Sequence, residues 1–374
     1  NLAEKIAMTV TESPYRVTAE TISNTCGQSI SSGGVWNMMQ RLGERLDEEE
    51  QYAVKEMHAD RTQGEKIIPV LFEEMDGIWL HMQDSSHKRM KKQEMKVFTM
   101  YEGWDKDQQR RSTLVGKTML AGMESSRLFH EKREALIEKK YDVDEIQQRI
   151  LNGDGGSWIK ETYDPDAIFQ LDRYHVYQEI LRKINDRSAQ REARNLFEEG
   201  KTEELLEFLL VYADSVETTD EKDNRSRNAR ELYRYLNNNK AGLLPYQKQG
   251  KKIPEPREGI VYKNMGVQES QNCTVITMRM KHRRMRWSVK GASNMAKVLC
   301  CKENKELCRT IEKYTDGLIF NARMNEIMET LSAAKTSKKD GKGNRYVELM
   351  RGHVPLIDAA ATASRKAFRN AFIR

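Results

Sequence analysis

An apolar strand that ends in Asn-Gly-Asp-Gly-Gly, within residues 149–160, constrains the fold of this chain more than any other segment. The run from Arg149 to Asn152 leads into Asp154, which stands between glycines, with Trp158 just behind. Glycines carry no side chain, so a polyanionic backbone can approach the carboxylate closely. Hard cations such as Mg²⁺ prefer oxygen ligands. The same residues also form an ordinary tight turn, so Asp154 becomes a candidate metal ligand only together with other acids.

Two more acids belong to short apolar segments. Asp76 lies inside a run from Ile67 to Leu80, in the element Asp-Gly-Ile-Trp. Asp172 closes a third run, which starts at Ala167, and His175 follows three residues later in a predicted helix. The chain therefore offers several acids, each within or directly after a predicted strand.

In this order, the segments resemble bacterial insertion-sequence transposases of the DDE class, in the group related to Mutator elements whose members were long filed as uncharacterised proteins. The resemblance spans nearly the whole chain. The matching pieces are Met75–Leu80, Asn152–Lys160, Leu171–His175, Gly266–Glu269, Arg279–Arg283 and Trp287-Ser288.

The resemblance implies that Asp76, Asp154 and Glu269 are the catalytic residues and hold two Mg²⁺ or Mn²⁺ ions. The first Asp would bridge both ions, and the second Asp and the Glu would each hold one. Two cations about 4 Å apart activate a water and stabilise the leaving oxygen in phosphodiester cleavage. The resemblance also implies a role for Asp172 and His175 near the active site or in organising DNA, although His175 also fits a hydrogen-bonded core histidine.

The third acid lies in a predicted helix that begins near Gly266. Helical spacing puts Glu269 on one face with three other residues, at intervals of four, three and four. A charged side chain on such a face needs a partner or a metal ion, and a surface glutamate at a frayed helix start is the alternative. The other residues of that face are Cys273, Ile276 and Met280.

The order of predicted elements is that of an RNase H-like fold. Strands are expected at residues 67–82, 95–103 and 113–121, then a helix at 125–140, then strands at 149–152 and 167–171. We expect an α/β protein with an RNase H-like mixed five-stranded sheet flanked by helices, an N-terminal helix-turn-helix and an all-α insertion. In that fold the first strand lies beside the fourth, so Asp76 and Asp154 would be neighbours.

The N-terminal region is predicted to be helical. Val35, Trp36, Met39 and Leu42 form an amphipathic face, and a hydroxyl residue before them can cap the helix. A helix-turn-helix and a helical hairpin with no DNA role fit this pattern equally, and the resemblance favours binding of the element's terminal inverted repeats. The residues expected to contact DNA here are Ser32, Trp36, Asn37 and Gln40.

Five regions are expected along the chain, and because it starts with Asn1 we expect the gene product to be longer. They are the helix-turn-helix with a connecting helix at 1–64, the first part of the core at 65–184, the helical insertion at 185–256, the final core helices with the third acid at 257–334, and a basic linker and C-terminal helix at 335–374. In the last region Arg365, Lys366 and Arg369 could meet DNA or a second subunit.

The net charge is +6, but the basic residues are clustered. Both clusters flank proposed catalytic segments, and residues so placed would neutralise phosphates and make DNA affinity salt-dependent. A solvated surface face is the alternative. The clustered residues expected to bind DNA are Lys88, Arg89, Lys91 and Lys92, and then Arg279, Lys281, Arg283, Arg284 and Arg286.

Several classes are disfavoured. No run approaches the roughly 18 apolar residues of a membrane helix, and no signal peptide opens the chain, so we expect an intracellular protein. The resemblance implies a bacterial cytoplasmic, nucleoid-associated one. Five cysteines without paired spacing argue against a disulfide scaffold or a zinc ribbon. A phosphate loop fails at Arg111, and a calcium loop fails at Tyr163.

The resulting hypothesis is a DNA transposase that cuts its element's ends and joins them to target DNA, acting as a homo-oligomer on DNA. Two alternatives stay open. One is a catalytically inactive RNase H-like protein that binds DNA as a regulator. The other is a metal-dependent nuclease that cuts without joining.

Overall fold

A computed structural model describes most of the chain, in two compact units. One unit contains residues 2–39 and 306–315, and the other contains the described residues of 40–305. The predicted basic linker and the C-terminal helix with Arg365, Lys366 and Arg369 lie outside the described residues. No helix in the described ranges is long and apolar enough to cross a membrane. These ranges are 2–84, 86, 88–107, 113–160, 164–218 and 223–315, without the side chain of Arg283.

The first unit is helical. It holds α1 (Leu2–Glu12), α2 (Tyr15–Cys26) and the start of α3 (Ser32–His58). Gly27 ends α2 in the left-handed conformation, at φ 64°, which costs a glycine little. The Ser31 hydroxyl accepts a hydrogen bond from the Gly34 amide at 3.0 Å and caps α3.

The expected connecting helix is not a separate element, because α3 continues unbroken from Ser32 to His58. Gly43 lies inside it, where a Cβ atom would come within 2.4 Å of the Asn294 side chain. The glycine therefore serves close packing against α12 (Val289–Glu303) rather than a break in the helix.

The second unit is built on a five-stranded mixed sheet in the order β5-β2-β1-β6-β7. Strand β1 pairs antiparallel with β2 and parallel with β6, so the prediction that the first strand lies beside the fourth is confirmed. The predicted third strand is split into two, because Gly116 turns the chain at φ 65°. The strands are β1 (Val70–Leu80), β2 (Gln93–Tyr101), β5 (Thr118–Gly122), β6 (Gln148–Gly153) and β7 (Ile168–Leu171).

A small second sheet has the order β4-β3-β8. It lies next to the last residues of β2. Tyr101, the last residue of β2, pairs with Phe72 near the start of β1, and β3 begins two residues after Tyr101. Its strands are β3 (Gly103–Asp105), β4 (Leu114–Val115) and β8 (Ile260–Val261).

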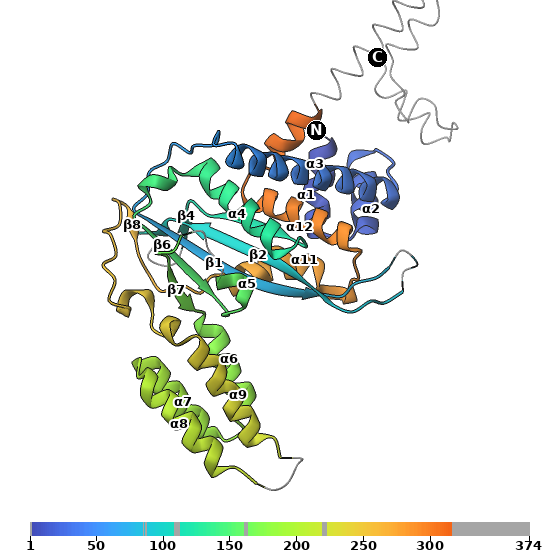
Figure 1. Cartoon of the computed structure of the whole chain (residues 1–374). Helices are drawn as coiled ribbons and strands as arrows, with labels where there is room; N and C mark the ends of the chain where they lie inside the picture. Colours follow the sequence, from blue (N-terminus) through green and yellow to red (C-terminus); the bar gives the residue numbers. More distant parts are fainter. Residues whose placement is uncertain are drawn as a thin grey trace, which may run out of the picture. The chain divides into compact units, whose positions relative to one another are not determined.

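Alternating side chains give the large sheet two buried faces. Met75, Phe98 and Leu151 pack with residues of α4 (Ser126–Lys140) and α5 (Ser157–Lys160) on one face. On the other face Phe72 stacks on Tyr101 at 5.4 Å between ring centroids. Figure 1 shows α4 lying across the first of these faces.

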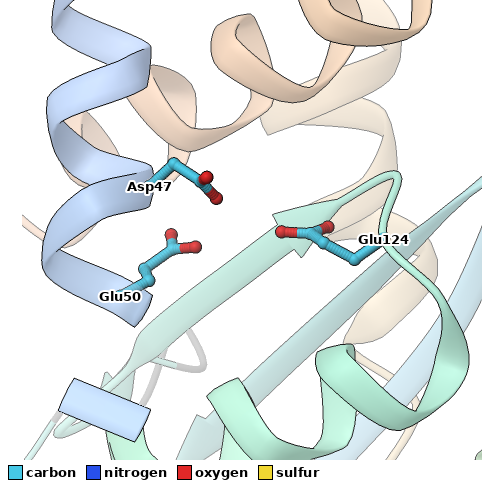
Figure 2. Close-up of side chains that lie close together, drawn as sticks. All are labelled: Asp47, Glu50 and Glu124. Atoms are coloured by element: carbon cyan, nitrogen blue, oxygen red, sulfur yellow. The ribbon is translucent and has the colours of Figure 1, made fainter. Parts of the chain in front are cut away.

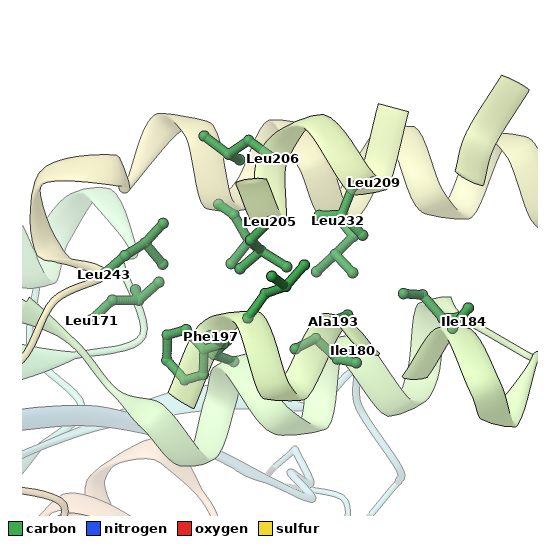
Figure 3. Close-up of a cluster of buried hydrophobic side chains, with 14 residues drawn as sticks. Leu171, Ile180, Ile184, Ala193, Phe197, Leu205, Leu206, Leu209, Leu232 and Leu243 are labelled. Carbon is green, nitrogen blue, oxygen red and sulfur yellow. The ribbon is translucent and has the colours of Figure 1, made fainter. Parts of the chain in front are cut away.

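Four helices follow β7. The first is α6 (Arg173–Lys183), which precedes the insertion expected at 185–256, and the others are α7 (Arg187–Glu199), α8 (Thr202–Ser215) and α9 (Arg225–Asn238) within it. Their apolar faces enclose one cluster, in which Phe197, Leu205 and Leu232 are buried (Figure 3). Leu171 of β7 belongs to the same cluster, so the insertion is packed onto the edge of the sheet.

The segment with the third acid is helical, but its register differs from the prediction. It runs through α10 (Gln268–Gln271), a π-helix (Asn272–Thr277) and α11 (Met278–Met280). The prediction that Glu269 and Cys273 share a buried face with Ile276 and Met280 is wrong for the first two, which are exposed. The π-helix has more residues per turn than an α-helix, so it rotates the face. The amides of Gln268 and Asn272 are buried in their place.

Candidate active site

Asp76 lies in the second half of β1 and is only 7% exposed. The Gly77 amide donates to Oδ1 at 2.7 Å, and the Asn272 side-chain amide donates to Oδ2 at 2.6 Å. Burial, with a smaller contribution from the charges of Asp154 and Glu269, raises the pKa of Asp76 to about 6 against the lowering effect of His175 and the Gly77 amide. Asp76 therefore lies near other negative charges, and a bound cation would reduce the repulsion among them.

Asp154 follows β6 in a turn, where its Oδ1 accepts a hydrogen bond from the Gly156 amide at 2.8 Å. Parallel pairing sets Gly153 opposite Met75, so the next residues, Asp154 and Asp76, are neighbours at the same edge of the sheet. The Tyr235 hydroxyl of α9 donates to the Asp154 carbonyl oxygen at 2.8 Å. The insertion thus contacts the loop that carries this acid.

The glycines around Asp154 also have a role in the fold itself. A Cβ atom on Gly153 would lie 2.4 Å from Ile159, and one on Gly155 would lie 2.5 Å from Asn239. Gly155 also has a positive φ of 84°. These two glycines are needed for the turn and for close packing within the chain.

Glu269 lies in the first turn of α10 and is exposed. Its charge acts on Asp76 together with that of Asp154, so the structure brings the three predicted acids into one electrostatic environment. Among the described residues, their ligand atoms are not all within 4.8 Å of one another. In these positions the three carboxylates do not form a site for one ion held by all three.

The donor set fits the expected metals. All three side chains offer carboxylate oxygens, the ligands that Mg²⁺ and Mn²⁺ favour.

His175 faces the acids from the first turn of α6. Its Nδ1 lies 3.3 Å from Oδ1 of Asp172, and its Nε2 lies 3.7 Å from Oδ1 of Asp76. Burial lowers the pKa of His175, but the hydrogen bond to Asp172 and the charges of Asp76 and Asp154 outweigh this and raise it to about 9. The metal-free site therefore holds a protonated imidazole at neutral pH.

Asp172 is buried and caps α6, accepting from the His175 amide at 3.1 Å. It also accepts from the Asn152 side-chain amide at 2.8 Å. It therefore orients the imidazole and connects it to β6.

Other polar residues around the site were not predicted. Glu74, Asn152, Gln268 and Asn272 are all buried polar residues. The signal for Glu74 and Asn152 was their spacing, because each stands two residues before a predicted catalytic acid and so shares its face of the strand. The burial of Gln268 and Asn272 could not be predicted from α-helical spacing, because a π-helix begins at Asn272.

Glu94 of β2 is a further carboxyl near the site. Burial and the charge of Asp154 raise the pKa of Glu94, while Lys96 and a hydrogen bond from Trp158 lower it. The Trp158 indole, predicted to lie behind Asp154, therefore contacts β2.

The two predicted basic clusters meet in the structure. The Gln83 amide donates to the Trp287 carbonyl at 2.9 Å, and the Trp287 amide donates to the His81 carbonyl at 3.0 Å. Desolvation and the charges of basic residues from both clusters lower the pKa of His81. We call this exposed group the basic hairpin surface, and it comprises Lys88, Arg89, Lys91, Lys92, Lys281 and Arg286.

Two residues expected to bind DNA are not available to it. Arg279 is 5% exposed, and its guanidinium lies 5.5 Å from the ring centroid of Trp287, so it packs inside the protein. Gln40 is 7% exposed and accepts a hydrogen bond from Asn294 at 2.8 Å. Both are held by packing between elements that sequence spacing does not reveal.

The other predicted contacts that the structure describes are exposed. They are Ser32, Trp36, Asn37 and Arg284, in addition to the basic hairpin surface, and the side chain of Arg283 lies outside the described part.

A second acidic group, Asp47, Glu50 and Glu124, has its ligand atoms within 4.8 Å of one another (Figure 2). Two lysines fill the space that a cation would need. Lys132 lies 2.6 Å from Asp47 and 2.5 Å from Glu124, and Lys297 lies 2.5 Å from Glu50 and 2.7 Å from Glu124. Both lysine side chains are 1% exposed. The group is therefore an ion-pair network that joins α3, α4 and α12 rather than a metal site.

Comparison with known proteins gives a family without a described activity. A family model described as an uncharacterised protein family, UPF0236, matches residues 2–315. A UPF0236 protein of Caldanaerobacter subterraneus subsp. tengcongensis is 23% identical over 354 residues, which cover 91% of this chain and 67% of that protein. Two others from the same organism are each 22% identical over 333 residues, which cover 85% of this chain and 63% and 60% of those proteins.

The chain thus spans about two thirds of the length of these relatives. The name of the first relative joins eleven loci, and that of the second joins four. Since the family model matches most of its length, the chain belongs to the uncharacterised protein family UPF0236.

Proposed function

We propose that this chain is a DDE-type DNA transposase that cuts the ends of its element and joins them to target DNA. The observation that carries the proposal is that strand pairing sets Asp154 beside Asp76, and that Asn272, three residues after Glu269, donates a hydrogen bond to Asp76. Three acids from distant parts of the sequence thus lie near one another. The sheet order and the parallel pairing of β1 with β6 support an RNase H-like fold as the scaffold.

The side chains suggest how the site works. Asp76 would be shared between two Mg²⁺ or Mn²⁺ ions, with Asp154 and Glu269 each completing one of the two binding positions. Bound there, the ions would activate a water, or later the freed 3′-hydroxyl, and stabilise the leaving oxygen. Asn272 and the Gly77 amide fix the orientation of Asp76. His175 holds a proton within reach of Asp76 and so limits the repulsion among the acids before cations bind.

The basic hairpin surface supports DNA as the substrate. His81, whose pKa is lowered by the charges of these basic residues, lies five residues after Asp76 in the sequence. At about 3.3 Å per strand residue, this corresponds to about 17 Å. A DNA backbone bound there would have a phosphate within reach of the acids, and its affinity would be salt-dependent.

The N-terminal helices are proposed to recognise the element's ends. Helix α3 exposes Ser32, Trp36 and Asn37 on its first turns, and Trp36 is 46% exposed. We propose that the protein acts on DNA in the cytoplasm, as a homo-oligomer that holds two ends together.

The names of the relatives support a mobile element. One name joins eleven loci in a single organism, and a gene carried by a transposing element accumulates in this way. An ordinary enzyme or regulator has no comparable reason to occur at so many loci.

The test is an assay of nicking and strand transfer on DNA that carries the sequences flanking the gene. Wild-type protein should nick and join in Mg²⁺ or Mn²⁺, whereas Asp154→Asn should fall to the background rate and Glu124→Gln should keep activity. Nicking without joining would indicate a nuclease. DNA binding with no activity above that of Asp154→Asn would leave only the regulatory role.

A further inference from the structure

Glu74 is a buried carboxyl that the proposed chemistry does not use. It lies two residues before Asp76 on β1, so the two side chains share one face of the sheet. Its residue exposure is 0%, although a buried carboxylate is costly unless it is fully hydrogen-bonded. The hydrogen-bond donors around Glu74 therefore indicate its role.

Three of its partners are consecutive backbone amides at the start of α10. Gly266 and Val267 donate to Oε1 at 3.0 and 3.2 Å, and Gln268 donates to Oε2 at 3.1 Å. The first amides of a helical segment have no partner within the helix, and a carboxylate is a favourable acceptor for them. Glu269 is the next residue, so Glu74 binds the backbone immediately before the third catalytic acid.

Two further donors come from the neighbouring strands. The Tyr101 hydroxyl of β2 donates to Oε1 at 2.6 Å, and the Asn152 amide of β6 donates to Oε2 at 3.1 Å. Asn152 stands two residues before Asp154. Glu74 therefore touches the elements that carry all three acids.

We propose that Glu74 is a positioning residue, which holds the start of α10 so that Glu269 faces Asp76 and keeps β6 aligned through Asn152. This inference rests on the proposed function only in taking the three acids as metal ligands. Glu74 itself donates no ligand, because its two oxygens already accept five hydrogen bonds.

The proposal predicts that glutamine cannot replace Glu74. A glutamine has one acceptor oxygen, so its NH₂ group would face either Asn152 and Gln268 or the three donors now on Oε1. Donors that face each other repel, and buried donors left without acceptors cost free energy. The start of α10 should then loosen even though the side-chain volume is unchanged.

Glu73 provides a matched control. It is buried on the same strand but faces the other side of the sheet, where Arg149 donates to its two oxygens at 2.6 and 2.9 Å. Glu73→Gln weakens a buried ion pair without touching α10. Any effect shared by the two variants is therefore a general loss of stability.

The test combines two measurements on Glu74→Gln, Glu73→Gln and wild-type protein. Hydrogen exchange in metal-free protein should be at least tenfold faster at the amides of residues 266–268 in Glu74→Gln, and unchanged there in Glu73→Gln. Titration with Mn²⁺ should show an affinity about 10–100-fold lower for Glu74→Gln, as for the loss of other groups that orient metal ligands, and near wild type for Glu73→Gln.

The proposal is overturned if Glu74→Gln matches wild type in exchange and in Mn²⁺ affinity, or if Glu73→Gln changes both to the same extent. Failure of the proposed function gives a different result. In that case wild type binds Mn²⁺ no better than Asp76→Asn, while the exchange measurement still decides whether Glu74 holds α10.

Discussion

Asp76 is the residue on which the acids of the site converge, since it is buried and feels the charges of both Asp154 and Glu269. The sequence made Asp76 and Asp154 predictable because each is followed by glycine and lies within or directly after an apolar run. It could not reveal that Asn272 orients Asp76, because that contact depends on a π-helix that no residue pattern marks. The sequence left open whether His175 lies near the active site or is a hydrogen-bonded core histidine. Its Nε2 lies 3.7 Å from Oδ1 of Asp76, beside the acids.

The pH dependence of metal affinity follows from Asp76. Its pKa of about 6 in the metal-free protein means that a proton competes with the cation below that pH. Mn²⁺ affinity should therefore fall about tenfold per pH unit below 6, if one proton is displaced. Calorimetric titration from pH 5 to 8 measures this, and an affinity that stays constant between pH 5 and 6 would contradict it.

At the scale of elements, the ion-pair network of α3, α4 and α12 shows what sequence reasoning lacked. Asp47, Glu50 and Glu124 are ordinary acids in charged segments, and only the fold brings Lys132 and Lys297 between them. The order of strands and helices was predictable because apolar runs and turn residues are local. The contacts between helices and the exact face of α10 depend on distant parts of the chain.

Glu124→Gln should lower the free energy of unfolding by about 2–3 kcal/mol, because Glu124 accepts charged hydrogen bonds from both lysines. Burial would raise the pKa of Glu124, but Lys297 and Lys132 lower it overall. A carboxyl whose pKa is lower in the folded state stabilises the fold at pH values above its unfolded-state pKa of about 4.3. This stabilisation is lost as the pH falls below that value. The difference between the two proteins in urea unfolding should thus shrink below about pH 4.3, and Mn²⁺ affinity should not change.

On the scale of the whole molecule, the predicted basic clusters were visible in the sequence, but their union was not. The two clusters come together through backbone hydrogen bonds that join Trp287 to His81 and Gln83, which lie about 200 residues earlier in the sequence. Their union turns two separate charge runs into one surface next to β1. The predicted contacts Gln40 and Arg279 failed because both are buried between elements.

Removing charge from the basic hairpin surface should weaken DNA binding in a salt-dependent way. For Arg89→Ala, Lys92→Ala and Arg286→Ala combined, the slope of log affinity against log salt should decrease in magnitude by up to about 3, at roughly 0.9 per lost phosphate contact.

The matched control combines Lys248→Ala, Lys251→Ala and Lys252→Ala. Lys251 donates to the carbonyl of Asp166, before β7 begins, whereas the acids lie at the other ends of the strands. Equal slopes for the two triple variants, measured by fluorescence anisotropy, would remove this surface from the account.

The central claim is that Asp76, Asp154 and Glu269 form the metal site. Anomalous diffraction from crystals containing Mn²⁺ tests it most directly. The account predicts two manganese peaks about 4 Å apart at Asp76, with none at Asp47, Glu50 and Glu124. Manganese bound at that second group, with no peak at Asp76, would contradict it.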